Sequence, residues 1–131
     1  MAEAIARDVY KDLDFTFTSR GVNVLMPARA TADAIRAVKL EYDLDLSNHL
    51  ARALTEADVR RAGLALTMTE AHKRYLLQVY PAYADKCFTL CEYVGVPLGD
   101  VRDPFGGDAV TYRACANELR GYIEKLNLGA L

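Results

Sequence analysis

The sequence has few of the residues and patterns that mark membrane-spanning or disulfide-bonded proteins. No apolar run approaches the roughly 18 residues that a membrane span needs, and the first residues do not follow the charged-then-apolar pattern of a signal region. The three cysteines are odd in number and irregularly spaced, so they do not form a disulfide framework. We therefore expect reduced thiols in a cytoplasmic protein with no membrane partner.

Neither sign of charge is in excess. Sixteen Lys and Arg residues stand against eighteen Asp and Glu residues, which gives a net charge of −2. This balance provides no basic surface for a polyanion, so nucleic acid is not an expected partner. A chain of 131 residues fits one globular domain with one core. We expect a single domain over residues 1–131.

No cysteine has the sequence surroundings of a phosphatase nucleophile. In a Cys-x5-Arg loop, the intervening backbone amides curl round a phosphate and the Arg donates two hydrogen bonds to it. None of Cys87, Cys91 and Cys115 is followed by Arg six residues later. Arg120 follows Cys115 by five residues, but within a periodic helix the two side chains point to different faces. We expect Cys91 and Cys115 to be small buried core residues.

The patterns of metal and nucleotide sites are also missing. His49 and His72 are isolated, and Cys87 and Cys91 lack the short spacing of a zinc knuckle. Neither G-x-x-x-x-G-K-[ST] nor G-x-G-x-x-G occurs. We expect no metal and no other cofactor.

Hydrophobic periodicity and capping residues predict alternating helices and strands. Helical spacing covers residues 2–13 and 32–42, and a Thr55–Asp58 capping box opens a short helix that Gly63 should close. Further helices are expected over residues 70–80 and from residue 108. Strands are expected over residues 15–22, 64–68 and 87–91. This order is that of a layered α/β domain with a parallel sheet, although such folds normally begin with a strand.

The loop before the last helix is the most informative segment. It carries Asp103 and Phe105 among several glycines, and loops at the carboxyl ends of parallel strands are where α/β proteins bind ligands. Asp-Pro followed by glycines also describes an ordinary turn. The residues alone leave both interpretations open: a turn, or a general acid beside an aromatic wall.

Four segments together resemble the low-molecular-weight protein tyrosine phosphatase family, over essentially the whole chain. They are Phe17-Thr-Ser-Arg-Gly21, His49-Leu-Ala-Arg-Ala-Leu-Thr55, Leu66-Thr-Met-Thr69 and Asp103-Pro-Phe-Gly-Gly107. Within the family, Lys86-Cys-Phe-Thr-Leu-Cys-Glu-Tyr-Val94 and Gly99–Gly107 look most like the bacterial branch that includes protein arginine phosphatases. The resemblance implies a three-layer α/β/α fold with a parallel sheet. It also implies dephosphorylation of phosphotyrosine or phosphoarginine in a phosphorylated protein substrate.

The resemblance assigns roles to four residues. Asp103 is the general acid, Phe105 lines the substrate pocket, and Ser19 and His49 support the phosphate loop by hydrogen bonding. Arg20 departs from the small residue usual at its position. Family members begin with a strand and a Cys-x5-Arg-Ser-Pro loop directly before Met-Ala-Glu, where this sequence starts. We therefore expect an N-terminally truncated phosphatase that is inactive in this form.

The missing segment leaves alternatives. In the family the absent strand is the centre of a sheet ordered 2-1-3-4, and its loss exposes two edges that favour pairing with another chain, so a homo-oligomer is one outcome. A second hypothesis is a non-catalytic binding protein on the same scaffold. A third is a fragment of an arsenate reductase, in which Cys91 resembles the first position of a cysteine relay but Leu98 occupies the second.

Overall fold

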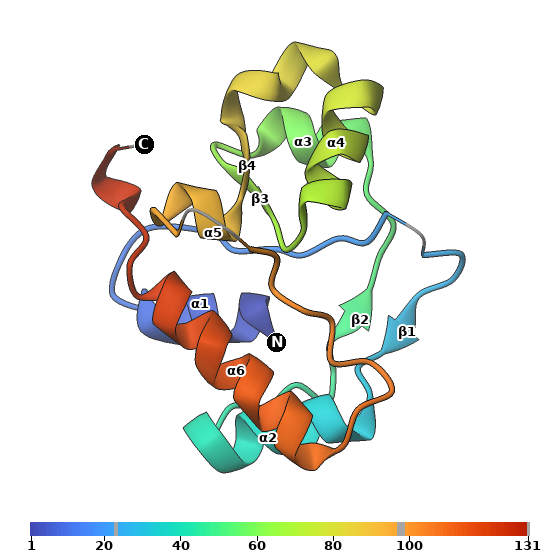
Figure 1. Cartoon of the computed structure of the whole chain (residues 1–131), viewed down its shortest axis with the longest axis vertical. Coiled ribbons are helices and arrows are strands. Elements are labelled where there is room, and N and C mark those ends of the chain that lie inside the picture. The colour runs from blue at the N-terminus through green and yellow to red at the C-terminus, as the bar shows by residue number, and fades with distance from the viewer. Residues whose placement is uncertain (23, 97–98, 131) are drawn as a thin grey trace. The chain divides into compact units, whose positions relative to one another are not determined.

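The computed structural model describes residues 1–22, 24–96 and 99–130 (Figure 1). They form two compact units. The first unit contains residues 1–53 and 103–124, and the second contains residues 54–102 and the segment from Lys125 onwards.

Three helices form the core of the first unit: α1 (Ala2–Val9), α2 (Ala32–Tyr42) and α6 (Ala109–Ile123). The helix α6 packs against both α1 and α2, as Figure 1 shows. Helix α2 begins where the Thr31 side chain accepts a hydrogen bond from the backbone N–H of Ala34. Val38 and Ile5 are fully buried between these helices, and Tyr112 of α6 joins the same apolar core as Val38.

A short antiparallel ladder completes the first unit. Strand β1 (Ala28–Arg29) pairs with β2 (Leu50–Ala51), with Ala28 opposite Ala51. The sequence assigned no strand to either segment, because two-residue strands are too short to show an alternating pattern. The ladder fixes the segment that carries His49, the residue directly before β2.

The second unit contains the parallel strand pair. Strand β3 (Ala65–Thr67) pairs in parallel with β4 (Cys87–Thr89), and α4 (Glu70–Val79) and the 3-10 helix η1 (Pro81–Lys86) connect them. Helix α3 (Glu56–Arg61) begins at the predicted capping box and ends at Arg61, with Ala62 as its C-cap and Gly63 directly after the cap, as predicted. A short helix α5 (Leu90–Tyr93) and the 3-10 helix η2 (Leu128–Ala130) complete the unit. The alternation of helices with a parallel pair confirms the α/β class.

The predicted strand over residues 15–22 is wrong. Within the described residues it is reduced to one parallel bridge between Gly21 and Ala53. The aromatic rings of this segment pack locally instead: Phe17 stacks on Tyr10 at 6.0 Å between ring centroids and lies 6.5 Å from Phe15. The alternation of aromatic and hydroxyl residues here reflects packing against the end of α1, and not a ladder of strands.

Two predicted boundaries also need correction. The first helix ends at Val9 rather than at residue 13. The last strand ends at Thr89 because a capping box formed by Thr89 and Glu92 starts α5, so Cys91 lies in a helix.

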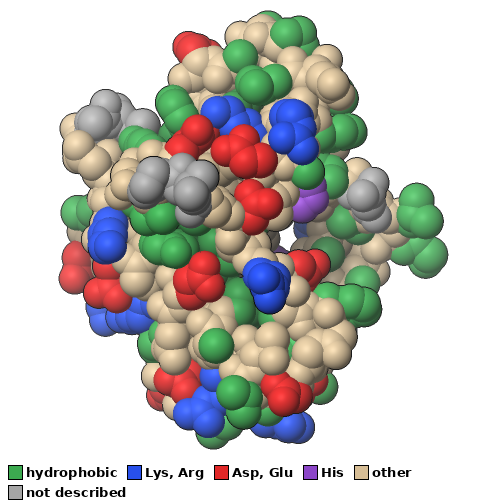
Figure 2. Space-filling model, viewed as in Figure 1, with side chains coloured by type: hydrophobic (Ala, Val, Ile, Leu, Met, Phe, Trp, Pro, Cys, Tyr) green, Lys and Arg blue, Asp and Glu red, His purple; other side chains and the backbone are tan. Residues whose placement is uncertain are grey.

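The surface carries mixed charge. On the face shown in Figure 2, acidic and basic side chains are interspersed among apolar ones. None of the helices in the described ranges is long and apolar enough to cross a membrane.

Candidate active site

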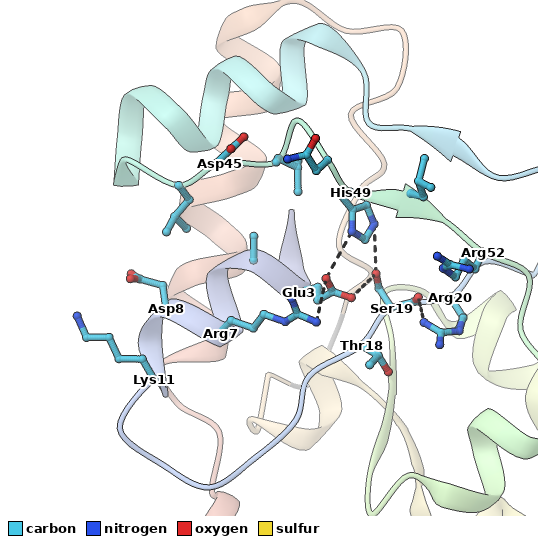
Figure 3. Close-up of a pocket in the computed structure, with 15 residues that line it drawn as sticks. Glu3, Arg7, Asp8, Lys11, Thr18, Ser19, Arg20, Asp45, His49 and Arg52 are labelled. Carbon is cyan, nitrogen blue, oxygen red and sulfur yellow. Dashed lines mark hydrogen bonds and ion pairs between the residues drawn. The ribbon is translucent and has the colours of Figure 1, made fainter.

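Glu3, Ser19 and His49 form a closed cluster in the first unit (Figure 3). The Ser19 hydroxyl donates to Glu3 Oε1 at 3.1 Å, and its oxygen lies 3.5 Å from His49 Nε2. His49 Nδ1 lies 3.4 Å from Glu3 Oε2. Each side chain thus restrains the other two.

The cluster is only partly exposed. The Glu3 side chain is 13% exposed and that of His49 is 23% exposed. A carboxylate at this depth needs partners, since burying an unpaired charge is costly. Ser19 and His49 provide them, which favours one fixed arrangement of the three groups.

Arg7 connects the cluster to the chain that carries Ser19. Arg7 lies one turn after Glu3 on α1, with its Nη2 atom 3.6 Å from Glu3 Oε2. Its guanidinium also donates two hydrogen bonds, of 3.1 and 2.9 Å, to the backbone oxygen of Phe17. Arg7 therefore holds the irregular segment before Ser19 against α1, in place of the strand that the sequence had predicted.

A hollow of about 660 Å³ borders this cluster. Figure 3 shows charged side chains of both signs around it, from α1, from residues 18–20 and from residues 45–52. Arg20, the departure from the family pattern, donates to the backbone oxygen of Ser19 at 2.7 Å. The larger side chain therefore adds a hydrogen bond next to the cluster without separating Ser19 from His49.

Asp103 and Phe105 lie in the same unit, in the loop that leads into α6. Asp103 Oδ1 accepts a hydrogen bond from the backbone N–H of Phe105 at 3.0 Å. The Phe105 ring is 77% exposed. Neither residue is among those that border the hollow. Of the four predicted site residues, the structure therefore brings Ser19 and His49 together. Asp103 and Phe105 lie apart from them, in an exposed loop.

The three cysteines are buried in the core. Cys91 on α5 is 2% exposed. Burial raises the pKa of the Cys87 thiol, and burial followed by the nearby charge of Glu118 raises that of Cys115. A thiol in this state is a poor nucleophile. Leu98, the second relay position in the arsenate reductase hypothesis, lies outside the described residues. In the part of the chain that the structure describes, no three His, Cys, Asp or Glu side chains gather as metal ligands.

Sequence reasoning missed Glu3 and Arg7. Its account of the cluster stopped at the two residues that the family resemblance supplied, Ser19 and His49. The available signal was the pairing of an acid with an arginine four residues later in the first helix, which places both on one face. The link from this pair to residues 17–19 is tertiary, and no local pattern reports it.

Comparison with known proteins identifies the family. The family model described as low molecular weight phosphotyrosine protein phosphatase matches residues 1–129. The chain therefore belongs to this family, as the resemblance predicted.

Two curated relatives cover nearly the whole chain. A protein-arginine-phosphatase from Bacillus subtilis is 37% identical over 128 residues, which cover 96% of this chain and 84% of the relative. The low molecular weight protein-tyrosine-phosphatase PtpB from Staphylococcus haemolyticus is 33% identical over 126 residues, which cover 96% of this chain and 86% of that protein.

Solved structures confirm the fold. A low molecular weight protein tyrosine phosphatase from T. tengcongensis superimposes with a TM-score of 0.90 and 42% identity, covering 95% of this chain and 85% of that one. The YwlE arginine phosphatase from Geobacillus stearothermophilus gives a TM-score of 0.86 and 31% identity, covering 95% and 79%.

Proposed function

We propose that this chain is the scaffold of a cysteine-dependent protein phosphatase that acts on phosphotyrosine or phosphoarginine in proteins. The observation that carries the proposal is the Glu3–Ser19–His49 cluster. The two side chains to which the resemblance gives a phosphate-loop role form one hydrogen-bonded unit, although 30 residues separate them. Relatives named as arginine and tyrosine phosphatases support both substrate classes.

Asp103 is the proposed general acid. Its Oδ1 atom is held by the Phe105 amide, so Oδ2 is the oxygen that carries the proton. In the first step a cysteine thiolate forms a bond to phosphorus while the bond from phosphorus to the substrate oxygen or nitrogen breaks. Asp103 gives its proton to that leaving atom. In the second step water attacks the phosphocysteine, Asp103 takes the proton from the water, and inorganic phosphate and the thiolate are released. The exposed Phe105 ring would line the path of the substrate side chain.

The nucleophile in this scheme must come from outside these 131 residues. Phosphoryl transfer by a cysteine needs a thiolate, a cradle for the phosphate and an acid on the leaving side. The 131 residues supply the acid but hold no Cys-x5-Arg sequence, and burial raises the pKa of Cys87 and Cys115. The 131-residue chain alone should hydrolyse aryl phosphates and phosphoarginine no faster than buffer.

A phosphatase assay on two lengths of chain tests the proposal. The 131-residue chain is compared with the same chain carrying an upstream strand and a Cys-x5-Arg-Ser-Pro loop, with intact mass verified for both. The extended chain should turn over phosphotyrosine or phosphoarginine peptides, and Asp103→Asn should lower turnover of a poor leaving group by roughly a hundredfold. Turnover by the short chain that is abolished by Cys91→Ser or Cys115→Ser would contradict the proposal.

A second candidate function is a non-catalytic binding protein, which the burial of all three cysteines favours. Failure of the extended chain to turn over any phosphoester or phosphoarginine would support it. Such a protein could form a homo-oligomer through sheet edges, which sedimentation velocity would detect. The free cysteines support a cytoplasmic location under either function, and cell fractionation checks it. The burial of Cys91 gives no support to the arsenate reductase alternative.

A further inference from the structure

The loop that carries Asp103 is closed by two successive turns. The first is the hydrogen bond from the Phe105 amide to the Asp103 carboxylate. The second is a hydrogen bond of 2.8 Å from the Gly107 amide to the backbone oxygen of Pro104. Gly106, the third residue of this second turn, has a φ of 83°, as a type II turn requires at that position. The two turns overlap at the peptide group between Pro104 and Phe105. Its N–H donates in the first turn and its carbonyl accepts in the second, so both turns fix its orientation.

Helix α6 begins directly after this loop, and its first turn fixes Thr111. Asp108 is the N-cap: its Oδ1 atom accepts from the Thr111 backbone N–H at 2.9 Å and from the Thr111 hydroxyl at 2.8 Å. A threonine whose hydroxyl is engaged in this way has one rotamer, because its branched Cβ is stiff. The direction of the Thr111 methyl group is therefore set by the helix cap.

Gly107 lies in the narrow space between the loop and this helix turn. A Cβ atom at Gly107 would lie 2.8 Å from Thr111 Cγ2, 2.9 Å from Thr111 Cβ and 2.9 Å from the backbone oxygen of Pro104. All three distances are shorter than ordinary contacts between side chains and backbone. Any larger residue must displace the Pro104 carbonyl or the start of α6. The space, and not an unusual φ, is what requires glycine here.

We propose that Gly107 and Thr111 are positioning residues that set the orientation of the Asp103 carboxylate. The Gly107 N–H donates to the Pro104 carbonyl, and this carbonyl belongs to the same peptide group as the Phe105 N–H that donates to Asp103. This proposal rests on the proposed function of Asp103 as the general acid. Moving the Pro104 peptide weakens the hydrogen bond from Phe105 to Asp103 and turns Oδ2 away from its aligned direction. The substitution should therefore slow proton transfer to the leaving group and leave substrate binding unchanged.

Leaving-group dependence in the extended chain tests the proposal. Gly107→Ala should lower kcat/KM for phenyl phosphate, a poor leaving group, by about tenfold, because kcat/KM reports the first step, in which the acid contributes only when aligned. The value of kcat/KM for 4-nitrophenyl phosphate, a good leaving group that needs little protonation, should stay within about twofold. Gly121→Ala is the matched control, since it makes the same chemical change on α6 where nothing lies within 4 Å of the added carbon. Equal losses on both substrates, or no loss, would overturn the proposal.

Thr111→Ser covers the case in which Gly107→Ala fails to fold. It keeps the hydroxyl that binds Asp108 and removes only the methyl group that faces Gly107. We expect the same selective loss, about threefold for phenyl phosphate, because part of the contact remains. Uniform or absent loss in a folded Thr111→Ser protein would show that Thr111 does not position the acid.

A measurement without catalysis separates this proposal from the proposed function. In the 131-residue chain, the Phe105 amide proton should shift in NMR spectra as the Asp103 carboxyl titrates, because the two are hydrogen-bonded. Gly107→Ala should abolish most of that shift, and Gly121→Ala should retain it. An inactive extended chain would refute the proposed function, whereas an unchanged Phe105 shift in Gly107→Ala would refute the positioning role.

Discussion

His49 Nδ1 lies 3.4 Å from Glu3 Oε2, so the first helix and the segment before β2 meet through a carboxylate and an imidazole. The other Glu3 oxygen accepts the Ser19 hydroxyl. Both oxygens of one carboxylate are thus used to hold two side chains with proposed roles in supporting a phosphate loop. Glu3 becomes the central member of the cluster, although it has no proposed contact with substrate.

Glu3→Gln should weaken this support in the extended chain. The amide keeps the size of the side chain but offers one acceptor oxygen in place of two, so it cannot hold Ser19 and His49 in the same way. We expect kcat to fall about tenfold for good and poor leaving groups alike, the scale of a misplaced catalytic loop. Steady-state kinetics with both aryl phosphates checks this. A loss confined to the poor leaving group would contradict it, because that pattern belongs to the general acid.

The three cysteines should resist alkylation in the native 131-residue chain. All are buried, and burial raises the pKa of Cys87 and Cys115, while alkylating agents react with the thiolate. Mass spectrometry after iodoacetamide at neutral pH should find the native protein almost unmodified and the urea-unfolded protein labelled three times. Rapid labelling of one cysteine in the native protein would contradict this prediction and would support a catalytic role for that thiol.

Asp108 should give the stability of the chain a specific pH dependence. Hydrogen bonds from the backbone N–H and then the hydroxyl of Thr111 lower the pKa of Asp108. A carboxyl with a lowered folded-state pKa stabilises the protein above its unfolded pKa of about 3.9, and this contribution is lost as the pH falls through the folded value. The urea midpoint of the unmodified chain should therefore fall more steeply below about pH 4 than that of Asp108→Asn, which keeps a cap without a charge. Parallel profiles would show that the cap carries no charge-dependent stability.

Ile5→Ala should be strongly destabilising. Ile5 is fully buried on α1, so truncation leaves a cavity, and such changes cost about 2–5 kcal/mol of the free energy of unfolding. Val110→Ala, at a position on α6 that is 71% exposed, is the control and should change that free energy by less than about 0.5 kcal/mol. Urea unfolding followed by circular dichroism measures both. Similar values for the two variants would mean that α1 does not pack as described.

The helix starts could be predicted because their signals are local. Thr55 caps the helix that the sequence assigned to it, and Thr31 and Thr69 cap the helices expected from residues 32 and 70. The capping box of Thr89 and Glu92 is equally local, and it was missed because the apolar run over residues 87–91 favoured a strand throughout.

The features that the sequence could not show depend on tertiary contacts. Phe15 and Phe17 have the alternation of a strand, but Tyr10 and Arg7 hold this segment without one. The Ser19–His49 contact depends on Glu3, which the family motifs did not include. Whether Asp103 and Phe105 have the roles that the resemblance gives them stays a prediction for the assays above.

The hydrogen bonds from Arg7 to the backbone of Phe17 have a consequence for cleavage of the backbone. Together with the stacking of Tyr10 on Phe17, they hold the two ends of the segment over residues 10–17 next to each other. The exposed Lys11 lies within this segment, between the two ends that these contacts hold together. A single tryptic cut after Lys11 should therefore leave two fragments that copurify under native conditions and separate in denaturant, with Ser19 still held beside Glu3. The short first helix would stay in place as a bound peptide.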